Sequence, residues 1–147
     1  MTDPTSQTSD GVPTYLENGD PALADYYPAW VGNLADDVTI EGSLLDGAAE
    51  GAEAARTIVG TIRTLYDAQE FHFAGPYGHN GFLEVYTAQV HGEPIGCVVL
   101  ITYNDAGQTQ HIAANYRPLS SLLLLSRLVG EKLAGTPNAK YFLASKA

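Results

Sequence analysis

The chain has 147 residues, of which 45% are hydrophobic and 16% charged, a balance typical of one globular domain with a full core. Seventeen acidic and seven basic side chains give a net charge of −10, so we expect neither a nucleic-acid nor a membrane partner. A single cysteine excludes an internal disulfide, and no apolar run approaches the ~20 residues of a membrane span, so a cytoplasmic protein is expected.

The N-terminal part of the chain predicts a leader followed by two helices. Residues 1–13 are rich in Ser, Thr, Asp and Pro and show no apolar period, which favours a disordered leader. Apolar residues at helical spacing then predict a short helix over 14–18. Asp20 as N-cap begins a second helix over 21–34, which Pro28 should kink or split.

The next part of the chain predicts two strands around one long helix. Residues 37–42 form a short strand, extended as far as Leu45, before Asp46-Gly47 turns the chain. The Ala-rich segment 48–69 carries one apolar stripe and predicts an amphipathic helix. Residues 70–74 alternate between polar and apolar side chains, which predicts a strand that ends at the following Gly-Pro pair.

Three long strands in series follow. Residues 82–90 form the first, and the apolar run 95–103 forms the second. The Asn-Asp-Ala-Gly sequence at 104–107 is typical of a hairpin loop, so 108–118 returns antiparallel to the second strand. These segments predict a meander.

A last helix over 119–133 completes a single domain that spans residues 14–134. The tail, 135–147, either docks through its aromatic residues or frays. Helices gathered on one face of a bent antiparallel sheet make an α+β domain. The conical space between the sheet and the helices is the default ligand pocket.

The order of these elements, with the sequences LADDVTIEG at 34–42 and DAGQT at 105–109, resembles the NTF2-like superfamily. Within it the chain looks closest to the SnoaL-like polyketide cyclases, the ketosteroid isomerases and the limonene-epoxide-hydrolase type. The resemblance covers about residues 14–133 and implies a cone-shaped, cystatin-like α+β fold and a homodimer. These sequences mark the fold more than the reaction.

The residues of the ketosteroid isomerase site are not retained. By resemblance, the general-base aspartate falls on Gly42, and the oxyanion-hole aspartic acid falls on Val99 or Ile101. The oxyanion-hole tyrosine has a loose counterpart in Tyr15. Pocket-lining positions of the last strand map to Ile112, Ala114 and Tyr116. The chain therefore either has a different set of acid–base residues or is not catalytic.

Glu84 is the strongest candidate for an acid or base. The register that turns Phe82 and Tyr86 inward also turns Glu84 inward, where desolvation would raise its pKa toward neutral. The alternative register turns Leu83 and Val85 inward and leaves Glu84 in solvent. Both faces carry apolar residues, so periodicity does not decide between the two.

Glu70 and His72 share one face of their strand, and Phe71 and Phe73 share the other. The two phenylalanines more naturally point to the core, which leaves Glu70 and His72 on the outer face. An inward His72 would be able to shuttle a proton.

His111 is a third candidate, on the strand that ends the meander. An apolar-in, polar-out pattern places Ile112 and Tyr116 in the pocket and His111 on the outer face, where a subunit interface is one option. A bulge in this strand would reverse the parity and turn His111 inward.

Asp46 is first of all a turn or cap residue. However, a carboxylate pair made of Glu41 or Asp46 with Glu70 is what an epoxide-opening enzyme would need. One member would activate the nucleophile, and the other would protonate the departing oxygen.

The sequence has no phosphate-binding glycine motif, no metal-ligand spacing and no nucleophile elbow, so we expect no metal and no cofactor. We expect an acid–base enzyme, such as an isomerase, cyclase, dehydratase or epoxide hydrolase, that acts on a lipophilic polyketide-, terpenoid- or polyether-like small molecule. The alternative is a non-catalytic small-molecule-binding or dimerisation protein. Expected substrate contacts are Tyr15, Trp30, Tyr86, Val99, Ile112 and Tyr116.

Overall fold

The computed structural model describes residues 19–146, without the side chains of the last two of these. The predicted leader, the helix over 14–18 and Tyr15 lie outside the described residues. The strands are β1 (Leu34–Gly42), β2 (Ala49–Glu50), β3 (Ala68–Tyr77), β4 (Gly81–Val90), β5 (Glu93–Tyr103) and β6 (Thr109–Arg117). The α-helices of this part are α1 (Ala52–Thr64) and α2 (Leu119–Lys132).

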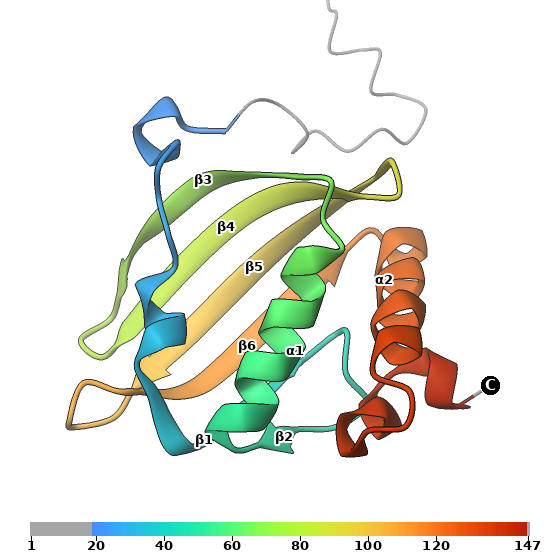
Figure 1. The fold of residues 1–147 in the computed structure, drawn as a ribbon. Helices are drawn as coiled ribbons and strands as arrows, with labels where there is room; N and C mark the ends of the chain where they lie inside the picture. The colour runs from blue at the N-terminus through green and yellow to red at the C-terminus, as the bar shows by residue number, and fades with distance from the viewer. Residues whose placement is uncertain (1–18, 147) are drawn as a thin grey trace, which may run out of the picture.

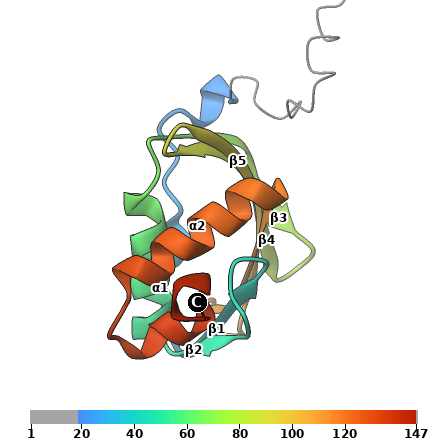
Figure 2. The ribbon, with the colours of Figure 1, turned by 90° about the vertical axis from the view of Figure 1, so that its right-hand side faces the viewer.

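The strands form one six-stranded sheet in the order β2-β1-β6-β5-β4-β3. Strands β3 to β6 are the predicted meander, extended by one strand and antiparallel throughout, whereas β1 pairs with β6 in parallel. The sheet is strongly bent, and both helices lie on its concave side (Figures 1 and 2). This is the predicted α+β architecture.

The helix predicted over 21–34 does not form. Two short 3₁₀ turns take its place, Pro21–Leu23 and Ala29–Gly32, and β1 already begins at Leu34. Pro28 precedes the second turn, and a proline both lacks an N–H donor and keeps the residue before it out of helical geometry. The predicted cap at Asp20 is present, because its carboxylate accepts a bond of 2.9 Å from the Ala22 N–H.

Two further boundaries differ from the prediction. Helix α1 is shorter than 48–69, because Ala49–Glu50 pairs with β1 and Gly51 begins the helix with φ +113°. Strand β3 runs past the expected stop at Pro76 to Tyr77. Since β3 is an edge strand of the sheet, a proline there removes no hydrogen bond that a neighbouring strand requires.

The core lies between the concave face of the sheet and the helices. Helix α1 contributes Ala55, Ile58 and Ile62, three buried residues at helical spacing. Cys97 on β5 is fully buried, the small core residue that its apolar surroundings predict. The C-terminal tail docks rather than frays, because the Phe142 side chain is only 1% exposed. No helix of the described residues is long and apolar enough to cross a membrane.

Candidate active site

Glu84 lies on the concave face of the sheet, in the middle of β4. It is flanked across the strands by Ala74 on β3 and Val99 on β5, and the residues on either side of it along this face are Phe82 and Tyr86. Its side chain is only 1% exposed. A carboxyl group has therefore been placed inside an otherwise apolar core.

Two aromatic side chains hold one oxygen of Glu84. The Tyr26 hydroxyl and the Trp30 indole N–H, the latter at 2.7 Å, both donate to Oε2. The donors stand on either side of Pro28, so the break in the predicted helix is what places them. Among the described residues, Oε1 of Glu84 has no hydrogen-bond partner, which leaves that oxygen available to a ligand.

The environment of Glu84 raises the pKa of its carboxyl group above the ordinary value of 4.5. Burial is the main cause, because desolvation penalises the charged form. The bonds from Tyr26 and Trp30 and the charge of Arg63 act in the opposite direction and offset part of the increase. This balance suits a group that gives and takes a proton.

A cluster of tyrosines lies beside this carboxyl group. The hydroxyl oxygens of Tyr66, from the chain just after α1, and Tyr86 are 2.6 Å apart. Tyr86 and Tyr116 of β6 line a cavity next to Glu84. Burial raises the pKa of all three phenols far above neutral, so they remain protonated donors. Burial also raises the pKa of Cys97 to about 12, which excludes a reactive thiolate near neutral pH.

The cavity next to Glu84 is small and apolar, with a volume of about 40 Å³. In this conformation it has room for about three water-sized groups. A wider pocket of about 450 Å³ adjoins it and shares Arg63, Gln69 and Phe71 with it. The residues that line the inner cavity include five of the expected substrate contacts, namely Trp30, Tyr86, Val99, Ile112 and Tyr116.

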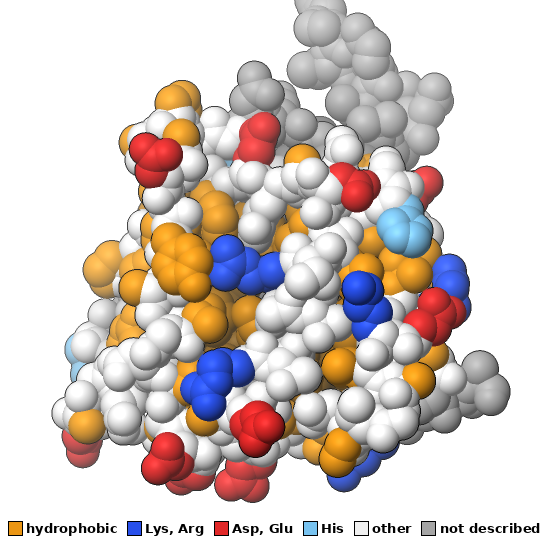
Figure 3. All heavy atoms as spheres, in the orientation of Figure 1, with side chains coloured by type: hydrophobic (Ala, Val, Ile, Leu, Met, Phe, Trp, Pro, Cys, Tyr) orange, Lys and Arg blue, Asp and Glu red, His pale blue; other side chains and the backbone are white. Residues whose placement is uncertain are grey.

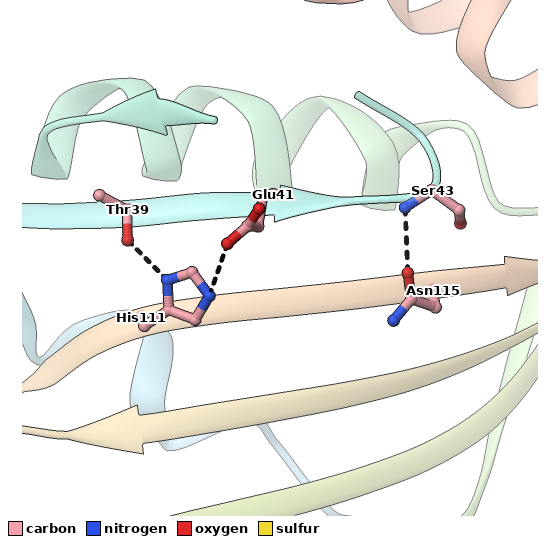
Figure 4. A network of polar contacts seen from close by, with 5 residues as sticks. All are labelled: Thr39, Glu41, Ser43, His111 and Asn115. Carbon is pink, nitrogen blue, oxygen red and sulfur yellow. Dashed lines mark hydrogen bonds and ion pairs between the residues drawn. The ribbon is translucent and has the colours of Figure 1, made fainter. Parts of the chain in front are cut away.

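His111 lies outside this cavity, on the outer face of the sheet. Its Nδ1 is 2.6 Å from Thr39 Oγ1, and its Nε2 is 3.0 Å from a carboxylate oxygen of Glu41 (Figure 4). Just after the end of β1, the Ser43 N–H donates to Oδ1 of Asn115 on β6 at 3.1 Å (Figure 4). The apolar-in, polar-out reading of β6 therefore describes the structure, and these polar side chains tie β1 to β6.

Glu70 and His72 also lie away from the cavity. His72 contacts Thr87 Oγ1 at 2.9 Å, and Glu70 accepts a bond of 2.5 Å from the Gly19 N–H. The prediction that Phe73 points to the core together with Phe71 is wrong, because Phe73 is 46% exposed. The register of β3 and β4 shifts between these phenylalanines, and such a bulge reverses the parity of the strand.

The predicted carboxylate pair is not assembled. Asp46 is exposed in the turn after β1, where its N–H donates to the Tyr141 carbonyl oxygen. Glu41 lies on the outer face of β1, and Glu70 lies on β3 at the far edge of the sheet. Among the described residues, Glu84 is the only acidic side chain that lines the inner cavity. No group of three or more His, Cys, Asp or Glu side chains in this part could hold a metal ion.

Sequence patterns did not indicate Tyr66, Arg63 or Gln69 as site residues, and they indicated Tyr26 only as part of an aromatic stripe that favours core packing over ligand binding. Tyr26 and Tyr66 belong to apolar stripes of predicted helices, where an aromatic side chain usually means core packing. Their hydroxyl groups meet polar partners only because the chain folds back over β4. The sequence offers one signal for these two tyrosines. A buried tyrosine needs a hydrogen-bond partner for its hydroxyl group, so a tyrosine in an apolar stripe predicts a polar partner nearby.

The free energy of unfolding should depend on pH through Glu84. Because its pKa in the folded protein lies above the ordinary 4.5, the stability it contributes is complete below that pH and is lost as the pH rises through the folded-state pKa. The unfolding free energy of the wild type minus that of Glu84→Gln should therefore fall as the pH rises above 4.5 and through the folded-state pKa of Glu84. Urea denaturation of both proteins measures this, and a pH-independent difference would contradict the raised pKa.

No protein-family model and no curated protein sequence matches the chain. Solved structures do match. An uncharacterised bacterial protein with a cystatin-like fold from Silicibacter pomeroyi DSS-3 is 17% identical, with a TM-score of 0.67 over 72% of this chain and 74% of that one. A steroid delta-isomerase from Pseudomonas aeruginosa is 20% identical, with a TM-score of 0.65 over 71% of this chain and 77% of that one.

An NTF2-like protein of unknown function from Burkholderia xenovorans LB400 is 15% identical, with a TM-score of 0.51 over 60% of this chain and 67% of that one. At such low identities these matches establish the fold and leave the reaction open. The neighbours are cystatin-like and NTF2-like proteins, in agreement with the resemblance seen in the sequence. The chain therefore has the NTF2-like fold.

Proposed function

We propose that the protein is a cofactor-independent acid–base enzyme that transfers a proton on a small, mainly apolar molecule, with Glu84 as the catalytic group. The observation that carries this proposal is a buried carboxyl group with a raised pKa in a cavity, with one oxygen held by two donors and the other without a partner among the described residues. A carboxyl group with a raised pKa in an apolar site is suited to general acid–base catalysis.

The chemistry that this arrangement supports best is enolisation. The Glu84 carboxylate would take a proton from a carbon next to a carbonyl group, and the electron pair of that C–H bond would move onto the carbonyl oxygen. The phenols of Tyr86 and Tyr116, which line the cavity, supply donors for this developing oxyanion. Return of the proton from Glu84 to a different carbon would isomerise the molecule.

Within the predicted range of reactions, the site favours an isomerase over an epoxide hydrolase. Opening an epoxide uses one group to activate the nucleophile and another to protonate the leaving oxygen. Glu84 has no second carboxylate beside it among the residues that line the cavity. The fold shared with a steroid delta-isomerase supports the same choice.

Hydrogen exchange tests this proposal without knowledge of the natural substrate. The protein is incubated in D₂O with a panel of small ketones, including cyclohexanone and 3-cyclohexenone, and loss of the α-hydrogen signal is followed by NMR. Exchange above the buffer rate is expected for at least one ketone, together with conversion of 3-cyclohexenone to the conjugated enone. Buffer rates for every ketone would contradict the proposal.

A non-catalytic binding protein is the second candidate. It is favoured by the small cavity and by the two bonds to Glu84 Oε2, which would also serve to satisfy a purely structural carboxylate. The two candidates differ in one measurable respect. A binding protein would retain an apolar ligand during purification and would show no exchange with the ketones.

We also propose that the protein forms a homodimer through the outer face of the sheet. An apolar patch lies on that face, made of residues that alternate with the buried residues of β4 and β5 and are each partly exposed: Leu83, Val85, Val98 and Leu100.

Light scattering after size exclusion should show a dimer for the wild type and a monomer for Leu100→Lys. The matched control is Leu123→Lys on α2, a residue that is 46% exposed on the opposite side of the sheet and should leave the dimer intact. A monomeric wild type, or a dimeric Leu100→Lys, would exclude this interface.

A further inference from the structure

Where the inner cavity meets the wider pocket, a boundary that we call the passage, two polar side chains have no described hydrogen-bond or ion-pair partner. Arg63 in the last turn of α1 and Gln69 on β3 line both spaces. Among residues 19–146, no carboxylate lies within 4.0 Å of the Arg63 guanidinium group, and neither side chain makes a hydrogen bond. The pair therefore offers donors at the passage that no described residue uses.

Arg63 is partly buried and is held in place by packing. Its guanidinium carbon lies 5.1 Å from the centre of the Tyr27 ring, an arrangement that stabilises a cation without neutralising it. The face of the molecule in Figure 3 shows Lys and Arg side chains set among hydrophobic ones. The chain has only seven cationic residues and a net charge of −10, so an arginine without a described ion pair in an apolar passage is unusual.

The acidic residues that line the wider pocket accept hydrogen bonds from backbone N–H groups. Asp20 and Glu70 line the wider pocket, but Asp20 caps the Ala22 N–H and Glu70 accepts from the Gly19 N–H. Glu84 lines the inner cavity, where burial raises its pKa and disfavours its charged form. Neither Asp20 nor Glu70 pairs with Arg63, so the positive charge of Arg63 is left to a ligand.

We propose that the ligand of this site is an amphipathic carboxylate, with its carboxylate group bound by Arg63 and Gln69 at the passage. A small apolar end of the ligand occupies the inner cavity beside Glu84, where about 40 Å³ is available. Arg63 and Gln69 supply the N–H donors that a carboxylate accepts, and arginine can bind both carboxylate oxygens at once. This proposal deepens the proposed function, because it names the class of substrate that the acid–base site would take.

Octanoate and 1-octanol test the proposal, because they share one chain and differ in the charge of the head group. Isothermal titration of the wild type should give octanoate an affinity at least about tenfold higher than that of 1-octanol, the range of a charge-assisted hydrogen bond. In Arg63→Met, octanoate should weaken by about tenfold or more, whereas 1-octanol should change by less than about twofold. Added salt should weaken only octanoate.

Arg56→Met is the matched control. Arg56 is exposed on the same helix and lines neither space, so its loss should leave both affinities unchanged. Equal thermal unfolding of the two variants and the wild type excludes a folding defect. The proposal fails if the wild type binds octanoate no tighter than 1-octanol, or if Arg63→Met weakens both equally. The titration measures binding without turnover. Its result therefore does not depend on whether Glu84 is catalytic, and the two proposals can fail separately.

Discussion

Exchange of α-hydrogens in D₂O is expected to fall at least about a hundredfold when Glu84 is replaced by glutamine, the range seen when a general base is lost. The amide has nearly the size of the carboxyl group but cannot take up a proton. Its carbonyl oxygen can still accept from Tyr26 and Trp30, so the surroundings of the side chain are retained. The NMR assay with ketones measures the loss directly.

Tyr26→Phe is the matched control for this experiment. It removes one of the two donors to Glu84 Oε2 and keeps the base, and the bond from Tyr26 lowers the Glu84 pKa. The variant should therefore remain active, and the pH at which its exchange rate rises should move upward. Full activity in Glu84→Gln would remove Glu84 from the mechanism. An unshifted pH profile in Tyr26→Phe would show that another group is titrating.

The alternation of apolar and polar side chains predicted the inward face of some strands and not of others. The alternation in β4 offered two registers, and the one that turns Glu84 inward with Tyr86 is the one that forms. The parity of β3 could not be read in the same way, because the register shift between Phe71 and Phe73 places Phe73 on the outer face. A bulge leaves no mark in the alternation of side chains, so the sequence did not indicate it.

The two donors to Glu84, Tyr26 and Trp30, come from a segment that the sequence predicts as a helix but that does not form one. Apolar spacing in residues 21–34 has a helical period, but Pro28 lies within it, and the chain instead makes two 3₁₀ turns. In a helix, Tyr26 and Trp30 would have belonged to one packing stripe. In the structure both reach the same carboxylate oxygen of Glu84, a contact 54 to 58 residues away along the chain. The candidate base was therefore predictable, and the residues that position it were not.

Gly42 shows why the ketosteroid isomerase base has no equivalent at its usual place. By resemblance, the general-base aspartate falls on this position, at the end of β1. Gly42 has φ +147°, which side chains rarely adopt, and a Cβ atom there would overlap the carbonyl oxygen of its β6 partner, Ala114. Any side chain at position 42 must therefore push β1 away from β6, and an acid–base group in this chain has to stand elsewhere.

Gly42→Ala is accordingly expected to lower the free energy of unfolding by about 3 kcal/mol or more, from backbone strain together with the clash. Gly60→Ala is the matched control, because Gly60 lies inside α1 with nothing within 4 Å of a Cβ atom. That change should stabilise the protein by about 0.5–1 kcal/mol. Urea denaturation measures both. A neutral Gly42→Ala would mean that β1 has room for a side chain, and then Gly42→Asp would become a realistic way to add a second carboxylate to the sheet, three strands from Glu84 in the same row of paired residues.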